Sequence, residues 1–293
     1  MLEQQLVNAL SLGCVYALFA LGFTLVFGVL GVVNLSHGAV FMVGAYAAER
    51  AVVLLHMPLW GALLFAFLFC GLIGLVIDVL VLRPLRARNA PHLIPMIATI
   101  GVAIILNNGT QGLFGAENRR FPASLVPEES LSLGGLHLTA LDLGIMLLSF
   151  AMMAVLLLTL KKTQLGRALR AIAESPKAAY LLGINVEGLF YLTSFVAAGL
   201  GGIAGVLIGL YSNALFPLMG QPMLHKGIAV IILGGMGDIR GALLAGLFLG
   251  FAEVLSVAYI GSSMRDAVGF GLLFLILLLR PKGLFGTVHE RKV

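Results

Sequence analysis

The chain has 293 residues, of which 60% are hydrophobic and 11% are charged, and its mean hydropathy is +1.07. Its 18 Lys and Arg and 13 Asp and Glu side chains leave a net charge of +5, but they are too few to cover the surface of a soluble domain of this length. The composition therefore excludes a soluble domain, and it predicts an all-α polytopic membrane protein. The positive net charge does not indicate a nucleic-acid partner, because the basic residues cluster in three short segments.

Apolar runs of about 18 to 25 residues, which are long enough to form membrane-spanning helices, recur along the chain. In chain order they occupy residues 6–30, 36–55, 60–82, 94–114, 139–160, 188–210, 222–236, 241–260 and 265–280. The run at 222–236 has only about 15 residues, which is short for a span. We therefore expect a transmembrane helical bundle of eight or nine spans, in which this run is either a ninth span or a re-entrant or discontinuous helix.

Basic residues mark one side of the predicted bundle. They cluster in three short segments: Arg83, Arg86 and Arg88; Lys161, Lys162, Arg167, Arg170 and Lys177; and Arg280, Lys282, Arg291 and Lys292. Short loops rich in Lys and Arg remain in the cytoplasm, so we expect the loop at 161–187 inside and the mixed-charge loop at 115–138 outside. The amino terminus is then outside and the carboxyl terminus inside, which requires an odd number of crossings.

Two polar breaks interrupt the apolar pattern, one in each half of the chain. The first is NLSHG at residues 34–38, and the second is YSNALFPLMGQP at residues 211–222. Paired interruptions of this kind point to the binding site of a transporter. The first break is either a tight cytoplasmic turn or the start of a discontinuous helix whose amide groups suit a substrate carboxylate. In the second interpretation the residues that line the substrate path are Asn34, Ser36, His37 and Gly38.

Glu253 is a further candidate for the substrate path. It lies within the apolar run at 241–260, and no basic residue is close to it in the sequence. A carboxylate inside a membrane is costly unless it faces the bundle interior or a cavity, although a position near the outer end of its helix would lower that cost. Asp78 lies near Arg83 at the inner end of another span, where we expect a structural role.

The sequence carries no motif of a catalytic centre. It contains no G-x-x-x-x-G-K-[ST] loop for nucleotide phosphates, no G-x-S-x-G nucleophile motif and no His or Cys spacing typical of zinc. Cys14 and Cys70 lie in apolar runs and are expected to pack as small hydrophobic residues. The chain is therefore predicted to be no enzyme and to hold no cofactor or metal itself, so ATP hydrolysis would belong to other subunits.

The segment 161–187 predicts a separate short helix in the cytoplasm. Ser175 is a favourable N-cap, Pro176 suits the first helical position, and Gly183 suits the left-handed residue that follows a helix. A capped helix with a small apolar face suits a groove on a partner protein, and the alternative is an ordinary interfacial loop helix. The expected face consists of Ala178, Ala179, Leu181 and Leu182.

Five stretches of the chain carry a family resemblance. They are YALFALGFTLVFGVLGVVNLSHGAVFMVGAY at 16–46, ESPKAAYLLGINV at 174–186, FVAAGLGGIAG at 195–205, GGMGDIRGALLAG at 234–246 and LLRPKGLFG at 278–286. In combination they are similar to the permeases of high-affinity branched-chain amino-acid uptake, the LivH type of ABC importer subunit. The short helix resembles the EAA loop that seats such permeases in their ATPases, with Lys in place of one Glu of that pattern. By this resemblance, the residues that couple to the ATPase are Glu174, Lys177, Ala178, Ala179 and Gly183.

The resemblance implies a single transmembrane permease domain over residues 1–293, located in a bacterial plasma (inner) membrane. The implied partners are two cytosolic ATPase subunits that hold ATP and Mg²⁺, a second related permease, and an extracytoplasmic substrate-binding protein. The alternatives are an ABC permease for urea or a short amide, and an ion-coupled secondary carrier or channel. The short capped helix that starts at Pro176, which we call the docking helix, distinguishes an ABC importer from a secondary carrier, because a secondary carrier has no ATPase to engage.

Overall fold

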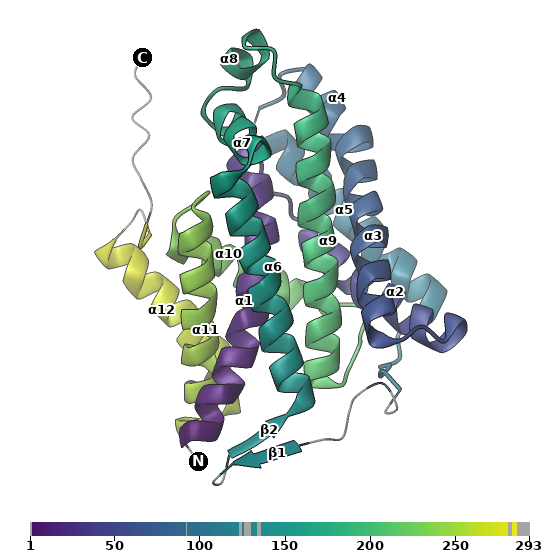
Figure 1. Cartoon of the computed structure of the whole chain (residues 1–293), viewed down its shortest axis with the longest axis vertical. Coiled ribbons are helices and arrows are strands. Elements are labelled where there is room, and N and C mark those ends of the chain that lie inside the picture. The colour runs from purple at the N-terminus through teal and green to yellow at the C-terminus, as the bar shows by residue number, and fades with distance from the viewer. Residues whose placement is uncertain are drawn as a thin grey trace.

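The computed structural model of the chain describes residues 2–91, 93–122, 125, 130–133, 136–280 and 283–285. Within these residues the long elements are all helices, and the only sheet is a hairpin of β1 (Ser130–Leu133) and β2 (Leu136–Thr139) in the loop that follows the fourth span. The predicted all-α bundle is therefore confirmed (Figure 1).

Most helices begin and end within a few residues of the predicted spans. In chain order they are α1 (Leu2–Leu30), α2 (His37–Leu55), α3 (Leu59–Ile77), a π-helical segment η1 (Asp78–Leu82), α4 (Arg83–Ala87), α5 (Leu93–Phe114), α6 (Ala140–Lys162), α7 (Gln164–Glu174), α8 (Pro176–Leu181), α9 (Val186–Ser212), α10 (Gly220–Gly234), α11 (Ile239–Tyr259), a 3₁₀ turn η3 (Ser262–Met264) and α12 (Arg265–Leu279). Among the described residues, eight helical stretches are long and apolar enough to cross a membrane. The 15-residue α10, which corresponds to the doubtful run at 222–236, is not one of them.

The two ends of the bundle differ in character. Figure 1 shows α4, α7 and α8 together at one end, and the start of α1 with the β1–β2 hairpin at the other. We call these the basic end and the hairpin end, because the first carries the described residues of the basic segments around α4 and α7. Their shared location is what the positive-inside rule requires of loops on one side of a membrane.

The chain crosses between these ends an odd number of times. Helix α11 runs antiparallel to α1, since Gly250 lies against Gly13 and Gly237 lies near Gly28. After α12 the chain returns to the basic end, where the amide of Leu284 donates to the carbonyl of Leu233 at 2.8 Å. The short α10 completes the ninth passage together with the irregular residues 213–219 that lead into it. The expected parity is thus satisfied by eight long helices and one short one.

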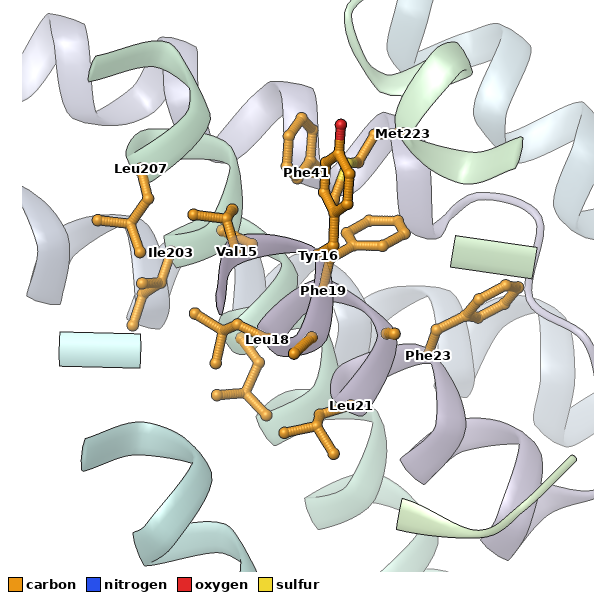
Figure 2. Packing of buried hydrophobic residues seen from close by; sticks show 14 of the residues in the cluster. Val15, Tyr16, Leu18, Phe19, Leu21, Phe23, Phe41, Ile203, Leu207 and Met223 are labelled. Atoms are coloured by element: carbon orange, nitrogen blue, oxygen red, sulfur yellow. The ribbon is translucent and has the colours of Figure 1, made fainter. Parts of the chain in front are cut away.

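Helices α1 and α9 form the centre of the bundle. In an apolar stretch of 18 residues from each span, 89% of the residues are buried in α1 and 78% in α9. The corresponding shares are 17% in α5 and 6% in the span formed by η3 and α12, so these helices lie at the periphery. Glycines permit α1 and α9 to approach closely; for example, a Cβ at Gly22 of α1 would collide with the carbonyl of Ala197 in α9. Figure 2 shows the resulting packing, in which α1 side chains such as Leu18 face Ile203 of α9.

Candidate translocation site and docking helix

The first polar break is a discontinuity inside the bundle. Helix α1 ends at Leu30, Gly31 adopts a left-handed φ of 67°, and α2 starts at His37. The His37 ring stacks on Phe23 with 5.5 Å between ring centroids, and it lies 4.7 Å from Phe19. Phe23 precedes the end of α1 by about two helical turns, or roughly 10 Å. The first residue of α2 therefore lies closer to the hairpin end than the last residue of α1 does. The backbone therefore follows the discontinuous-helix interpretation rather than a turn outside the bundle.

The polar side chains of this break bond to one another, and a backbone amide of the break bonds to α5. The Ser36 hydroxyl and amide both donate to Oδ1 of Asn34, at 2.6 and 3.1 Å. The Leu35 amide donates to Oγ1 of Thr99 at 3.1 Å. His37 is buried between aromatic rings and glycines, and its Nε2 has no hydrogen-bond partner among the described residues. Asn34 and Ser36 thus shape the break, and His37 fills the interior next to it.

The second polar break meets the first inside the bundle. Helix α9 ends at Ser212, the following Asn213 has a left-handed φ of 46°, and Leu215 forms an isolated β-bridge with Arg119 before α10 begins. Gly38 and Gly220 then lie so close that a Cβ on either would collide with the backbone carbonyl of the other. The paired breaks seen in the sequence therefore bring the amino-terminal ends of α2 and α10 into contact.

A cavity of about 310 Å³ opens beside this contact. It lies between the first turns of α2 and α10 and one face of α5, and neither helix start has a side-chain cap. The positive ends of two helix dipoles favour a negative group, and the aliphatic lining suits an apolar side chain. The lining residues are Leu35, Gly38, Ala39, Ile100, Ala103, Ile104, Asn107, Gly220, Gln221, Leu224 and His225.

Of the path residues predicted at the first break, Gly38 lines this cavity, whereas Asn34, Ser36 and His37 are not among its lining residues. The polar lining residues Asn107, Gln221 and His225 were not singled out for this role by the sequence. One signal for the last two was present, because Gln221 belongs to the second polar break and His225, four residues later, shares its helix face.

Glu253 lies away from the cavity in a separate cluster of charges. Its Oε2 accepts hydrogen bonds from Tyr16 at 2.8 Å, Lys226 at 2.7 Å and Arg265 at 2.9 Å. Lys226 also donates to the Tyr16 hydroxyl at 2.9 Å and lies 3.6 Å from a carboxylate oxygen of Asp266. The cluster balances two positive against two negative side chains and joins α1, α10, α11 and α12. We call it the Glu253 cluster.

The geometry of the Glu253 cluster indicates a structural role, in which it holds four helices together. The space beside it has a volume of about 10 Å³, which is close to the minimum for one water molecule and too small for an amino acid. Glu253 is only 1% exposed, so water does not solvate its carboxylate. The three surrounding donors compensate its charge instead. Lys226 was missed by sequence reasoning, because it lies 27 residues from Glu253 and the run that contains it was judged on its length alone.

The short helix at the basic end carries the expected cap and stop. The Ser175 side chain accepts from the amide of Ala178 at 3.2 Å, Pro176 starts α8, and Gly183 has a left-handed φ of 81°. Glu174 ends α7 directly before this cap.

The outward face of α8 differs from the expected one. Ala179 is 1% exposed and packs inside this chain, whereas Lys177 and Ala178 are exposed. The large outward side chains are Tyr180, Leu181 and Leu182, which are 71%, 78% and 79% exposed. With only one turn and a half of helix, the sequence could not show which small residue faces inward.

Comparison with known proteins identifies the family. The family profile described as "Branched-chain amino acid transport system / permease component" matches residues 5–277. The chain is 37% identical to the high-affinity branched-chain amino acid transport system permease protein BraD of Pseudomonas aeruginosa, over 99% of this chain and 97% of that protein. It is 36% identical to the corresponding protein LivH of Escherichia coli, with the same coverage.

A more distant relative is the permease protein LivM of the same Escherichia coli transport system. It is 26% identical over 97% of this chain and 71% of its own length. The match of the family profile includes every residue that lines the cavity, every residue of the Glu253 cluster and the whole of α8. The chain belongs to the permease family of branched-chain amino acid transport systems.

Proposed function

We propose that the chain is the membrane-spanning subunit of an ATP-driven importer for leucine, isoleucine and valine. It acts as a single permease domain in a bacterial plasma membrane and catalyses no reaction itself. Its partners are two cytosolic ATPase subunits, a second LivM-like permease and an extracytoplasmic binding protein. The family membership and the names of the full-length relatives support the substrate class.

The observation that carries the proposal is the cavity at the contact between α2 and α10. Two helix starts without side-chain caps face one cavity, and this arrangement favours the carboxylate of an amino acid. Aliphatic residues such as Leu35, Ile100 and Leu224 supply surface for a branched apolar side chain. We place the substrate path here, past Gly38 and the break that Asn34, Ser36 and His37 form. Glu253 serves this path indirectly, because it holds α10 in place.

The alternatives fit these features less well. Urea and short amides are neutral, so they gain less from the positive potential at two helix starts. A secondary carrier needs no docking site, whereas α8 presents the large exposed side chains Tyr180, Leu181 and Leu182 at the basic end. We assign this face, with Glu174, Lys177, Ala178 and Gly183 around it, to the contact with the ATPase subunits.

The test is uptake into liposomes that contain the complete complex, with the binding protein outside and ATP inside. Radiolabelled leucine should accumulate only with hydrolysable ATP, and valine but not urea should compete. Accumulation driven by an ion gradient without ATP would favour a carrier, and competition by urea would favour the amide alternative.

A pair of glycine variants locates the path. Gly38→Ala should reduce uptake, because the added methyl group pushes α2 from α10 at the cavity. Gly144→Ala is the matched control, since a Cβ there meets no atom within 4 Å. The control should transport normally, and it should be neutral or stabilising, because alanine favours a helix over glycine by about 1 kcal/mol. Equal uptake by both variants would place the path elsewhere.

A further inference from the structure

A buried ion pair occupies the place where α3 changes into α4. Asp78 is fully buried and accepts two hydrogen bonds from Arg86, at 2.6 Å to Oδ1 and 3.1 Å to Oδ2. The pair spans the π-helical segment η1, whose wider turns accommodate Pro84 within the continuous helix. A π-helical segment is a common site of helix bending. The ion pair therefore fixes the geometry of α3 at the point where this helix bends most readily.

Arg86 also contacts the start of α9. Its guanidinium carbon lies 4.6 Å from the centre of the Phe190 ring, and its Nη2 lies 3.6 Å from a carboxylate oxygen of Glu187. Only 17% of the Arg86 side chain is exposed, so the cation–π contact is largely shielded from water. One side chain therefore joins the first turns of α9 to the buried carboxylate of α3.

The start of α9 is in turn tied to the docking helix. The Ile184 amide donates to the carbonyl of Ala179 at 3.1 Å, and the Asn185 side chain caps α9 by accepting from Gly188 at 3.0 Å. In contrast, a groove of about 890 Å³ separates α8 from α4, with Tyr180 on one wall and Arg86 on the other. A displacement of α8 therefore reaches α3 through α9 rather than across the groove.

We propose that Arg86 is a positioning residue that transmits a displacement of α8 through the first turns of α9 into α3. The inference rests on the proposed function, in which the ATPase subunits displace α8. Arg86 touches neither the cavity nor the outward face of α8, so its role is to hold Asp78 and Phe190 in one rigid unit. Lysine could not replace it, because a point charge can neither form the two-pronged bond nor stack on the ring in the same way.

The test measures leucine uptake and phosphate release in the same liposomes and compares their ratio between variants. Arg86→Lys removes the two-pronged bond to Asp78, and Phe190→Leu removes the aromatic ring that Arg86 contacts. Each variant should lower the number of leucines imported per ATP by about fivefold or more. ATP hydrolysis and the composition of the complex should be preserved. Arg83→Lys is the matched control, because Arg83 lies 3.8 Å from the same Glu187 but does not reach Asp78. Its ratio should stay within about twofold of wild type, as for an exposed pair.

The double variant distinguishes a transmission role from general damage. If both residues belong to one link, Arg86→Lys with Phe190→Leu should be no worse than either single variant. The inference would be overturned if the loss in the double variant equalled the product of the two single losses. It would also be overturned if either single variant formed a complex of normal subunit composition and imported as many leucines per ATP as the wild type. Should Arg86→Lys fail to assemble, Phe190→Leu decides alone. Absence of ATP-dependent uptake in the wild type would instead overturn the proposed function and the inference together.

Discussion

Two buried carboxylates organise this protein, and they do so in different ways. Glu253 accepts hydrogen bonds on one oxygen from three side chains that come from α1, α10 and α12. Asp78 bonds to Arg86, eight residues further along the same continuous helix. The first carboxylate therefore unites segments that are distant in sequence, whereas the second stabilises a local irregularity and then reaches α9 through its arginine.

This difference predicts how each site responds to damage. Removal of Glu253 leaves Lys226 and Arg265, which come from different helices, without their shared partner, and the next carboxylate is Asp266 at 3.6 Å from Lys226. The Asp78–Arg86 pair lies within one continuous helix, so removal of Asp78 leaves the contacts between helices in place. Loss of the Glu253 cluster should therefore unfold the bundle more readily than loss of the Asp78–Arg86 pair.

The largest effect is expected for Glu253→Ala. It should lower the free energy of unfolding by about 3 kcal/mol or more, because it breaks a buried ion pair from one side only. Unfolding of the purified chain by SDS in mixed micelles measures this change. Glu253→Gln is the control of equal shape and should retain part of the stability. An unfolding curve for Glu253→Ala that overlays the wild type would show that the cluster has no structural role.

A smaller effect is expected for Lys226→Met, which keeps the length of the side chain but removes its charge. Glu253 then retains Tyr16 and Arg265, so the loss should be about 1.5 to 3 kcal/mol, typical of a hydrogen bond to a charged group. The double variant with Glu253→Gln should lose less than the sum of the two single losses. Strict additivity would mean that the two side chains do not interact in the membrane.

Asp78→Asn should have the next smaller effect on stability, at about 1 kcal/mol, because asparagine can still accept one hydrogen bond from Arg86. The same SDS titration measures it. If this loss exceeded that of Glu253→Ala, the order proposed for the two sites would be reversed.

The smallest effect belongs to Glu187→Gln at the exposed edge of the Asp78–Arg86 pair. The Glu187 side chain is 49% exposed and lies 3.6 and 3.8 Å from its two arginines. Exposed pairs of this kind contribute less than about 1 kcal/mol and weaken with salt. Stability should therefore match the wild type at high ionic strength, and a persistent loss under those conditions would contradict this assignment.

The sequence was sufficient to predict what depends on local pattern. Hydropathy located the spans, and the order Ser175, Pro176 and Gly183 predicted the capped helix α8. The local Asp78 site was expected as well, although the structure pairs it with Arg86 rather than with Arg83. Arg86 lies eight residues after Asp78, beyond the π-helical segment, and that irregular segment cannot be read from an apolar run.

What escaped prediction depends on contacts between distant segments. Tyr16 and Lys226 are 210 residues apart, and only the packing of α10 against α1 brings them together. The depth at which α2 begins follows from the turn at Gly31 and from the stacking of His37 on α1, which no pattern within NLSHG reveals. The chemical character of the site was visible in its polar breaks, whereas its lining residues from α5 and α10 required the fold.

In the proposed substrate path, the contact between Gly38 and Gly220 has a consequence for how the passage is kept shut. A barrier made of side chains opens when a rotamer flips, within nanoseconds and without help from the rest of the protein. Two glycines have no rotamers, and their contact is between backbone atoms of two helix starts. Such a seal parts only when whole helices move, so brief thermal fluctuations of single residues do not leak solute across it. A membrane that maintains steep gradients benefits from a seal whose opening requires collective motion.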